Sequence, residues 1–306
     1  MTAGERVGPT RRRPLHPSGL LGAALLGALL LATLLAPWLS LRGPTEVDLR
    51  LRLQAPSWSE PLGTDELGRS TLARVLHGGR VSLWVAVVTV LASAAAGGAL
   101  GTLASAAPGR LDGLLMRLVD ALLICPPLLL ALVIIGVLGP GLWPAALALA
   151  IAEAPVFARL VRSVILTTRE LPYVEAAIAS GARPRRVLLR HVLPAATGLV
   201  VVQATLTVGF VVVALSGLGF LGLGVQPPTA DWGDMLARAR HQLPAAPWLM
   251  LGPGAAVTAA VLGANLLGDA LRDALADRGG AAAGTLFERR ASSPRASSVR
   301  RPRGPA

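Results

Sequence analysis

The segment Glu170–Pro194, ELPYVEAAIASGARPRRVLLRHVLP, is a polar, arginine-rich stretch between two long apolar runs. Pro172 and Pro184 each suit the first turn of a helix, where the missing proline N–H costs no hydrogen bond. Gly181 lies between them, where a chain reversal requires a residue that tolerates positive φ. Pro194 is expected to stop the second helix. The segment therefore predicts two short helices joined by a glycine turn.

Apolar residues recur on each of these short helices at spacings of three and four. They are Leu171, Val174 and Ile178 on the first helix, and Val187, Leu188 and Val192 with His191 on the second. A helix of roughly eight residues is about 12 Å long, which is far too short to span a bilayer. Since such short helices are marginal alone in water, the apolar stripes indicate docking onto another surface.

The composition of the whole chain is that of a membrane protein. Of its 306 residues, 53% are hydrophobic and only 15% are charged, whereas about 25% of residues are charged in a soluble domain. Apolar runs of about 20 residues recur and predict an all-α, polytopic membrane protein with about six transmembrane helices. The first run is longer than the core of a typical cleavable signal, which favours a retained span. The expected spans are residues 20–39, 81–106, 113–138, 143–165, 195–217 and 247–268.

The distribution of charge predicts the orientation of the chain in the membrane. The formal net charge is +12, and all 29 basic residues are arginine. Arginines cluster between residues 159 and 190 and also at Arg11–Arg13, so the positive-inside rule places the 170–194 segment and both termini in the cytoplasm. The tryptophans that then fall at outer helix ends, as an aromatic belt requires, are Trp38, Trp84, Trp143 and Trp248. This basic balance indicates the lipid bilayer as a partner and no nucleic acid.

Two ionisable residues inside the expected spans are candidates for a translocation path. Asp120 lies three residues after Arg117, so it either forms an ion pair with Arg117 or takes part in gating. Glu153 lies near the middle of the fourth span. It either faces the path and favours amino groups or cations, or it is paired with another helix or held protonated. Pro126 and Pro127 are expected to kink the third span.

The sequence contains no pattern typical of an enzyme. A phosphate-binding Gly-Lys-Ser/Thr loop is excluded because the chain has no lysine. The one cysteine, Cys125, excludes a cysteine cluster, and the four histidines are far apart in the sequence. We therefore expect a chain without catalytic residues, cofactor or metal.

Four stretches of the chain resemble one protein family. Glu175-Ala176-Ala177, Gly181 and Leu193-Pro194 resemble the EAA loop of binding-protein-dependent ABC importers. The other three stretches are PLGTDELGRSTLARVLHGGRVSL at 61–83, LGFLGLGVQPPTADWGDML at 218–236 and NLLGDALRDAL at 265–275. The four stretches occur in the family's order, and the resemblance as a whole covers about residues 15–278. The chain therefore resembles the C-type permease subunit of the peptide/nickel ABC importer family, although members commonly carry Asp where Ser70 stands.

This resemblance implies the type I ABC importer permease fold and a set of partners. In the family the EAA loop docks on an ATP-hydrolysing subunit, so Glu175 would be the contact or orienting carboxylate and Gly181 the turn, with Arg185 and Arg186 beside them. The implied partners are a homologous permease subunit, two ATP-binding subunits and an extracytoplasmic solute-binding protein, in a bacterial inner membrane. The implied cargo is a di- or oligopeptide, or else nickel or another small solute.

The expected organisation is a cytoplasmic segment 1–18, a permease domain 19–278 with its coupling loop at 170–194, and a cytoplasmic tail 279–306. The tail is rich in Gly, Ser, Arg and Pro and is expected to be disordered. Two other classes of function stay open. One is a secondary transporter or channel that acts alone, although the sequence shows no inverted repeat. The other is a membrane scaffold, which would leave the four motifs unexplained.

Overall fold

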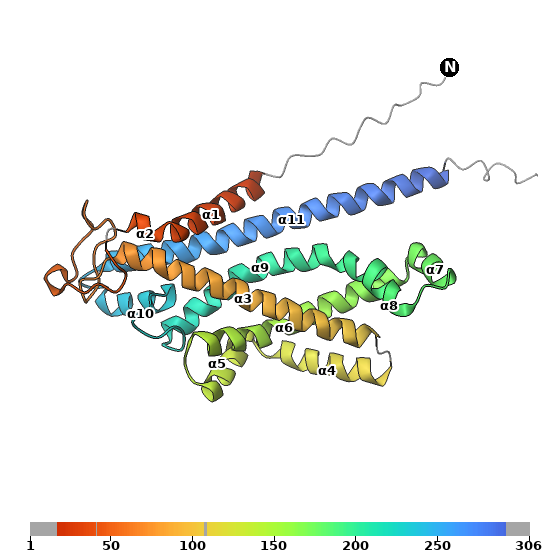
Figure 1. Cartoon of the computed structure of the whole chain (residues 1–306), viewed down its shortest axis with the longest axis horizontal. Coiled ribbons are helices and arrows are strands. Elements are labelled where there is room, and N and C mark those ends of the chain that lie inside the picture. The colour runs from red at the N-terminus through yellow and green to blue at the C-terminus, as the bar shows by residue number, and fades with distance from the viewer. Residues whose placement is uncertain (1–16, 41, 107–108, 292–306) are drawn as a thin grey trace, which may run out of the picture.

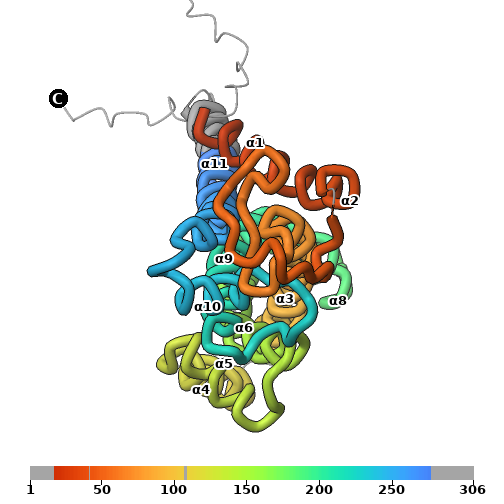
Figure 2. Tube along the Cα trace, turned by 90° about the vertical axis from the view of Figure 1, so that its left-hand side faces the viewer, coloured from red at the N-terminus to blue at the C-terminus, as the bar shows by residue number. Residues whose placement is uncertain are grey.

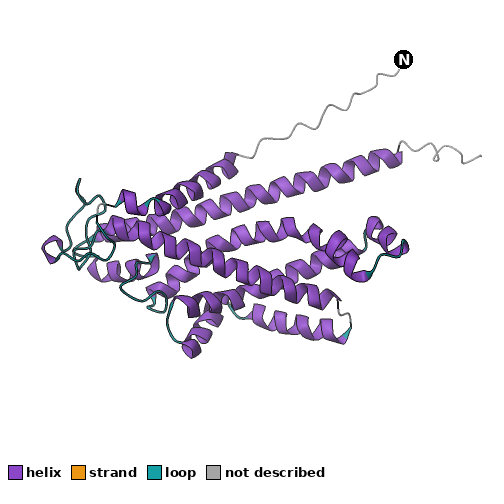
Figure 3. Cartoon of the chain, in the orientation of Figure 1, coloured by secondary structure: helices purple, strands orange, loops and turns teal. Residues whose placement is uncertain are grey.

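The computed structural model describes the chain except for residues 1–16, 41, 107–108 and 292–306, and the described part consists of helices and loops (Figure 3). The long helices are α1 (Pro17–Leu34), α3 (Thr71–Ala106), α6 (Leu142–Arg169), α9 (Leu193–Phe220) and α11 (Leu251–Ala291). The shorter ones are α2 (Ala36–Leu39), η1 (Leu49–Leu51), α4 (Arg110–Ile124), α5 (Pro127–Leu138), α7 (Pro172–Ala179), α8 (Pro184–Val187), η2 (Leu188–Val192), α10 (Trp232–Gln242) and η3 (Pro247–Met250).

Five helical segments are long and apolar enough to cross a membrane, and α4 with α5 supplies a sixth if the two are counted as one bent span. This confirms the predicted all-α, polytopic fold. The helices lie roughly along the long axis of the molecule (Figure 1). α7 and α8 lie at one end, which we call the loop end, and residues 42–70 with α10 lie at the other, which we call the cap end.

The end-on view shows three groups of helices (Figure 2). α3, α6 and α9 occupy the middle, α1 packs along α11 on one side, and α4 and α5 lie on the other side. The contact between α3 and α6 is the most extensive of all. It depends on Gly97 and Gly101, because a Cβ atom at either position would run into the backbone carbonyl of Ala154 or Ala158. Small residues at such spacing let two helix backbones approach closely.

The third span is broken, whereas the sequence predicted only a kink. α4 ends at Ile124, α5 begins at Pro127, and the two axes differ by 95°. Proline has no N–H, so two successive prolines remove the donors that would bond the carbonyls of Leu122 and Leu123 in a continuous helix. Pro126 and Pro127 therefore end one helix and start another.

Two helix ends also differ from the prediction. The second span begins at Thr71, well before residue 81, because Ser70 Oγ accepts the N–H of Ala73 at 3.4 Å and caps the helix. Trp84 consequently lies inside α3 and not at its start. At the other end of the chain, α11 extends to Ala291, beyond residue 279 where the tail was expected to begin, and the expected disorder of the tail stays a prediction. An alanine-rich sequence favours this extension. Residues 292–306 and most of segment 1–18 lie outside the described residues.

Candidate coupling site

Both helices that the sequence predicted in segment 170–194 begin at their prolines, and the first of them, α7, is short as expected. α7 ends in a Schellman turn. Gly181 has φ +79°, its N–H donates to the carbonyl of Ile178 at 2.9 Å, and the N–H of Ala182 donates to the carbonyl of Ala177 at 3.1 Å. The positive φ explains why glycine stands at this position.

The prediction that Pro194 stops the second helix is wrong. α8 passes through the π-turn Leu188–Val192 directly into α9, and the N–H of Leu193 donates to the carbonyl of Leu188. A proline ring inside an α-helix meets the carbonyl four residues earlier, and the wider π-turn just before Pro194 relieves that clash. Residues 184–220 therefore form one continuous helical segment that runs from the loop into the membrane-spanning bundle.

Val174 of the first apolar stripe and the apolar residues of the second stripe are already packed within the chain. Val174 of α7 is fully buried, and with Val187 and Val192 it packs against Val161 and Ile165 of α6. The loop is thus attached to α6 through side-chain packing and to α9 through the backbone. A displacement of the loop would act on both helices.

The remaining residues of the first stripe face outward, beside two apolar residues that belong to neither stripe. The large apolar side chains that are exposed here are Leu171, Tyr173, Ile178 and Leu189. Glu175 and Ala176 are exposed beside them, and Ala177 is half-buried. Arg183, Arg185 and Arg186 line an open hollow of about 600 Å³ at the turn. Within the described residues, neither Glu175 nor these arginines form an ion pair. The predicted site residues are therefore together on one exposed, mixed apolar and charged surface, which we call the outer loop face; Leu193 and Pro194 lie at its inner edge.

Two ion pairs connect α6 to α4 near the loop end. Arg162 binds Asp112 through two hydrogen bonds, at 2.8 and 2.6 Å, and Arg159 Nη2 donates to Asp120 Oδ1. The predicted pairing of Asp120 with Arg117 is therefore wrong. The sequence did contain a signal for the observed pairs: two acids on one helix and two arginines on the next occur in the order that antiparallel packing requires. A local i,i+3 rule could not detect it.

Glu153 is buried in α6, with 6% of its surface exposed, and forms no hydrogen bond or ion pair with the described residues. The structure does not bring it together with Asp120, which is half exposed on α4. The two candidate path residues thus lie in different surroundings.

At the cap end, two of the stretches that resemble the family pack against each other. Asp231 caps α10 by accepting the N–H groups of the two residues that follow Trp232, and it also accepts a hydrogen bond of 2.7 Å from Ser82 of α3. Trp232 is fully buried, and its Nε1 donates to the carbonyl of Val75 at 2.9 Å. The loop that precedes α10 is thereby fixed to α3. Burial raises the pKa of Asp231.

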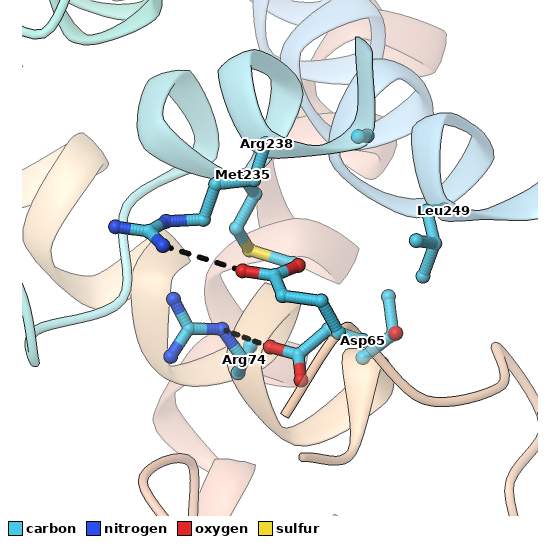
Figure 4. A pocket seen from close by; sticks show the side chains of 8 residues that line it. Asp65, Arg74, Met235, Arg238 and Leu249 are labelled. Carbon is cyan, nitrogen blue, oxygen red and sulfur yellow. Dashed lines mark hydrogen bonds and ion pairs between the residues drawn. The ribbon is translucent and has the colours of Figure 1, made fainter. Parts of the chain in front are cut away.

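A cluster of charged side chains completes this cap (Figure 4). Arg74, which is 2% exposed, lies 3.6 Å from Asp65 and 3.7 Å from Asp234. Arg238 binds Asp234 at 2.9 Å and Glu66 at 3.2 Å. The hydrogen bond with Asp234 raises the pKa of Arg238. Asp65, Glu66, Arg74 and Arg238 line a cavity of only about 20 Å³, which is enough for about one water molecule.

Asp65 and Arg69 form an ion pair, with an Nε–Oδ2 distance of 2.7 Å. It lies on a turn and not on a helix, because Asp65 Oδ1 accepts the N–H groups of Leu67 and Arg69 and closes that turn. Both side chains are buried. The loop at 61–70 is therefore an ordered part of the cap.

Comparison with known proteins agrees with this architecture. Residues 97–279 match the family model of the binding-protein-dependent transport system inner membrane component. The chain is 44% identical over 248 residues to the di/tripeptide transport system permease protein DppC of Pseudomonas aeruginosa, covering 79% of this chain and 82% of that protein. It is 40% identical over 242 residues to the dipeptide transport system permease protein DppC of Alkalihalophilus pseudofirmus, covering 79% and 80%.

A solved structure shares the fold. A chain of the inward-facing MetNI methionine ABC transporter superposes with a TM-score of 0.53 at 22% identity, covering 65% of this chain and 95% of that one. By the family match and by its relatives, the chain belongs to the family of binding-protein-dependent transport system inner membrane components, the permease subunits of ABC importers.

Proposed function

We propose that this chain is the permease subunit of an importer that moves di- or oligopeptides inward, and that partner ATPases drive it through the loop 170–194. The observation that supports this most is the two-sided structure of the loop. Its inner face is packed on α6, whereas its outer face exposes four large apolar side chains and charges that form no ion pair with the described residues. A surface of that kind on short helices fits a partner protein. The peptide cargo is suggested by the names of the relatives.

The route of the motion follows from the packing. Closure of two ATP-binding subunits would displace α7 and α8, and this would shift α6 through Val174 and α9 through the continuous helix. α6 is in turn bound to α4 by its two ion pairs, and Arg169 donates to the carbonyl of Ser105 at the end of α3. Rigid helices linked in this way would tilt together and expose a path alternately to each side.

The arginine-rich loop end would face the cytoplasm by the positive-inside rule. Figure 1 shows the first residues of α1 and the last described residues of α11 directed toward that end, which fits cytoplasmic termini. The cap would then face the opposite side and lie near an extracytoplasmic solute-binding protein. A homologous permease subunit would complete the membrane part.

Glu153 would face the translocation path and favour amino groups or cations. Its burial without an ion pair among the described residues is compatible with this role and with a protonated side chain. Uptake by a Glu153→Gln variant separates the two, because unchanged uptake and an unchanged range of substrates would exclude the selective role.

Co-purification and uptake test the function as a whole. A tagged chain should co-purify with ATP-binding subunits, and a strain that lacks it should lose ATP-dependent uptake of peptides. Glu175→Arg should insert normally and lose transport. Uptake by the purified chain alone, without a nucleotide hydrolase, would contradict the proposal and favour a secondary transporter or channel.

A further inference from the structure

One exposed face of α4 is chemically unsuited to lipid. α4 begins at the loop end and has 15 residues, so at 1.5 Å per residue it reaches about 22 Å into an apolar layer of about 30 Å. Its end at Ile124 is therefore at membrane depth. Ile124 is 81% exposed, and Cys125 and Pro126 are exposed as well.

The backbone at this break has unsatisfied hydrogen-bonding groups. Pro126 and Pro127 have no N–H, and the carbonyls of Leu122 and Leu123 accept no hydrogen bond from the described residues. Exposure of such groups to hydrocarbon costs several kcal/mol each. Irregular backbone at membrane depth is tolerated only where protein or a water-filled cavity surrounds it. Lipid is therefore excluded as the neighbour of this break.

The two ion pairs between α4 and α6 differ in their exposure and in their number of hydrogen bonds. Near the loop end, Asp112 and Arg162 form two hydrogen bonds, and their side chains are 20% and 28% exposed. Eight residues further along α4, Asp120 accepts one hydrogen bond from Arg159, and these side chains are 51% and 62% exposed. The pair that lies deeper in the membrane is thus the less satisfied and the more exposed one. A buried ion pair requires nearly all its hydrogen bonds to be made, so this pair is suited to water.

Arg117 lies on the same side of α4. It precedes Ile124 by seven residues, which is about two helical turns. It is exposed and forms no ion pair or hydrogen bond with the described residues. An arginine near a helix end can extend its guanidinium toward the interface. The half-exposed carboxylate of Asp120 and the carbonyls of Leu122 and Leu123 cannot be satisfied in that way.

We propose that this face, formed by Arg117, the Asp120–Arg159 pair and the Cys125–Pro126 break, lines a water-filled path in the assembled importer. Arg117 then presents a free positive charge that attracts the carboxylates of passing solutes. The proposal rests on the proposed transport function, and it identifies which surface of this chain the cargo passes. Burial of the same face by a second permease subunit is the competing arrangement, and it leaves these charges poorly satisfied.

Cys125 is the only cysteine of the chain and lies at the break, so the unmodified sequence supplies the probe. In the full transporter reconstituted in lipid, charged, membrane-impermeant methanethiosulfonate reagents should modify Cys125. The matched control is Ala24→Cys in a Cys125→Ser background, because Ala24 is also exposed but lies in the middle of the intact, uncharged α1. It should react with a lipid-soluble maleimide and not with the charged reagents.

Two results would overturn the proposal. Reaction of Cys125 only with the lipid-soluble reagent would place it in lipid. Protection in the full transporter, together with reaction in the isolated chain, would place it in a subunit interface. Neither readout requires ATP hydrolysis or transport, so loss of coupling in the same preparation would contradict the proposed function and leave this test intact.

The charge of Arg117 has its own test. A unit charge about 12 Å from Cys125 should favour an anionic over a cationic reagent. Arg117→Gln should therefore lower the ratio of the two modification rates at Cys125 by roughly threefold or more. Arg110→Gln, at the start of the same helix and about 10 Å further away, is the control and should leave the ratio nearly unchanged. An unchanged ratio in Arg117→Gln would contradict the role of Arg117.

Discussion

Truncation of Val174 to alanine tests whether the loop moves α6 by direct packing. Val174 is fully buried against α6 and contributes only apolar contacts to that cluster. Removing its two methyl groups costs about 1.6 kcal/mol at about 0.8 kcal/mol per buried carbon, and the cavity left behind raises the loss to about 2 kcal/mol. Since 1.4 kcal/mol is a factor of ten, the ratio of undocked to docked loop should rise roughly 30-fold.

The measurement is peptide uptake per ATP hydrolysed in proteoliposomes that contain the full transporter. Val174→Ala should retain ATP hydrolysis and lose most of the uptake, because the loop still reaches the ATPase but no longer moves α6. The matched control is Ile178→Ala on the same helix, which is 58% exposed on the outer loop face. Ile178→Ala should weaken binding of the ATP-binding subunit and leave the ratio of peptide uptake to ATP hydrolysis in assembled complexes unchanged. A normal ratio in Val174→Ala would refute the packing route.

Three further predictions concern the turn and the cap. In Gly181→Val the backbone conformation at φ +79° should be strained by about 1–3 kcal/mol because the residue is β-branched, and transport should fall. Gly181→Asn should retain most of the transport. Equal uptake by both variants would contradict the role of the turn. Arg74→Met should remove one of the two arginine partners of Asp65 and of Asp234, which keep Arg69 and Arg238. It should lower the free energy of unfolding by about 1–3 kcal/mol, measured by thermal unfolding in detergent against the exposed control Arg50→Met. Equal stability of the two variants would argue against a structural cap cluster. The pKa of Asp231 is raised above its ordinary 3.8, so its contribution to stability is present at low pH and is lost as the pH rises through the folded-state pKa. The free energy of unfolding of Asp231→Asn, relative to that of the parent, should therefore rise with pH. A difference that does not change with pH would contradict this.

Local rules predicted the features that depend on a few neighbouring residues. The starts of α7 and α8 follow from the fixed φ of proline, and the turn between them follows from the freedom of Gly181. The number of spans follows from the length of apolar runs. The same local logic failed at Pro194, because a proline rule does not anticipate that a π-turn can carry a helix past the ring.

Tertiary contacts decided the remaining features. Asp120 had Arg117 as a neighbour in the sequence, but packing of α6 along α4 brought Arg159 closer. The division of the first apolar stripe into a packed Val174 and an exposed Leu171 and Ile178 was also beyond the sequence, because periodicity identifies a stripe and not its partner. Val174 and Ile178 are equivalent by spacing, and only their neighbours in space distinguish them.

The most direct test of the central claim is a photocrosslink from the outer loop face. A photoreactive amino acid at position 178 should form an adduct with an ATP-binding subunit in the full transporter, and one at Val133, an exposed position on α5, should not. An adduct from position 178 with lipid or with the solute-binding protein, and none with an ATP-binding subunit, would contradict the claim that this loop couples ATP hydrolysis to transport.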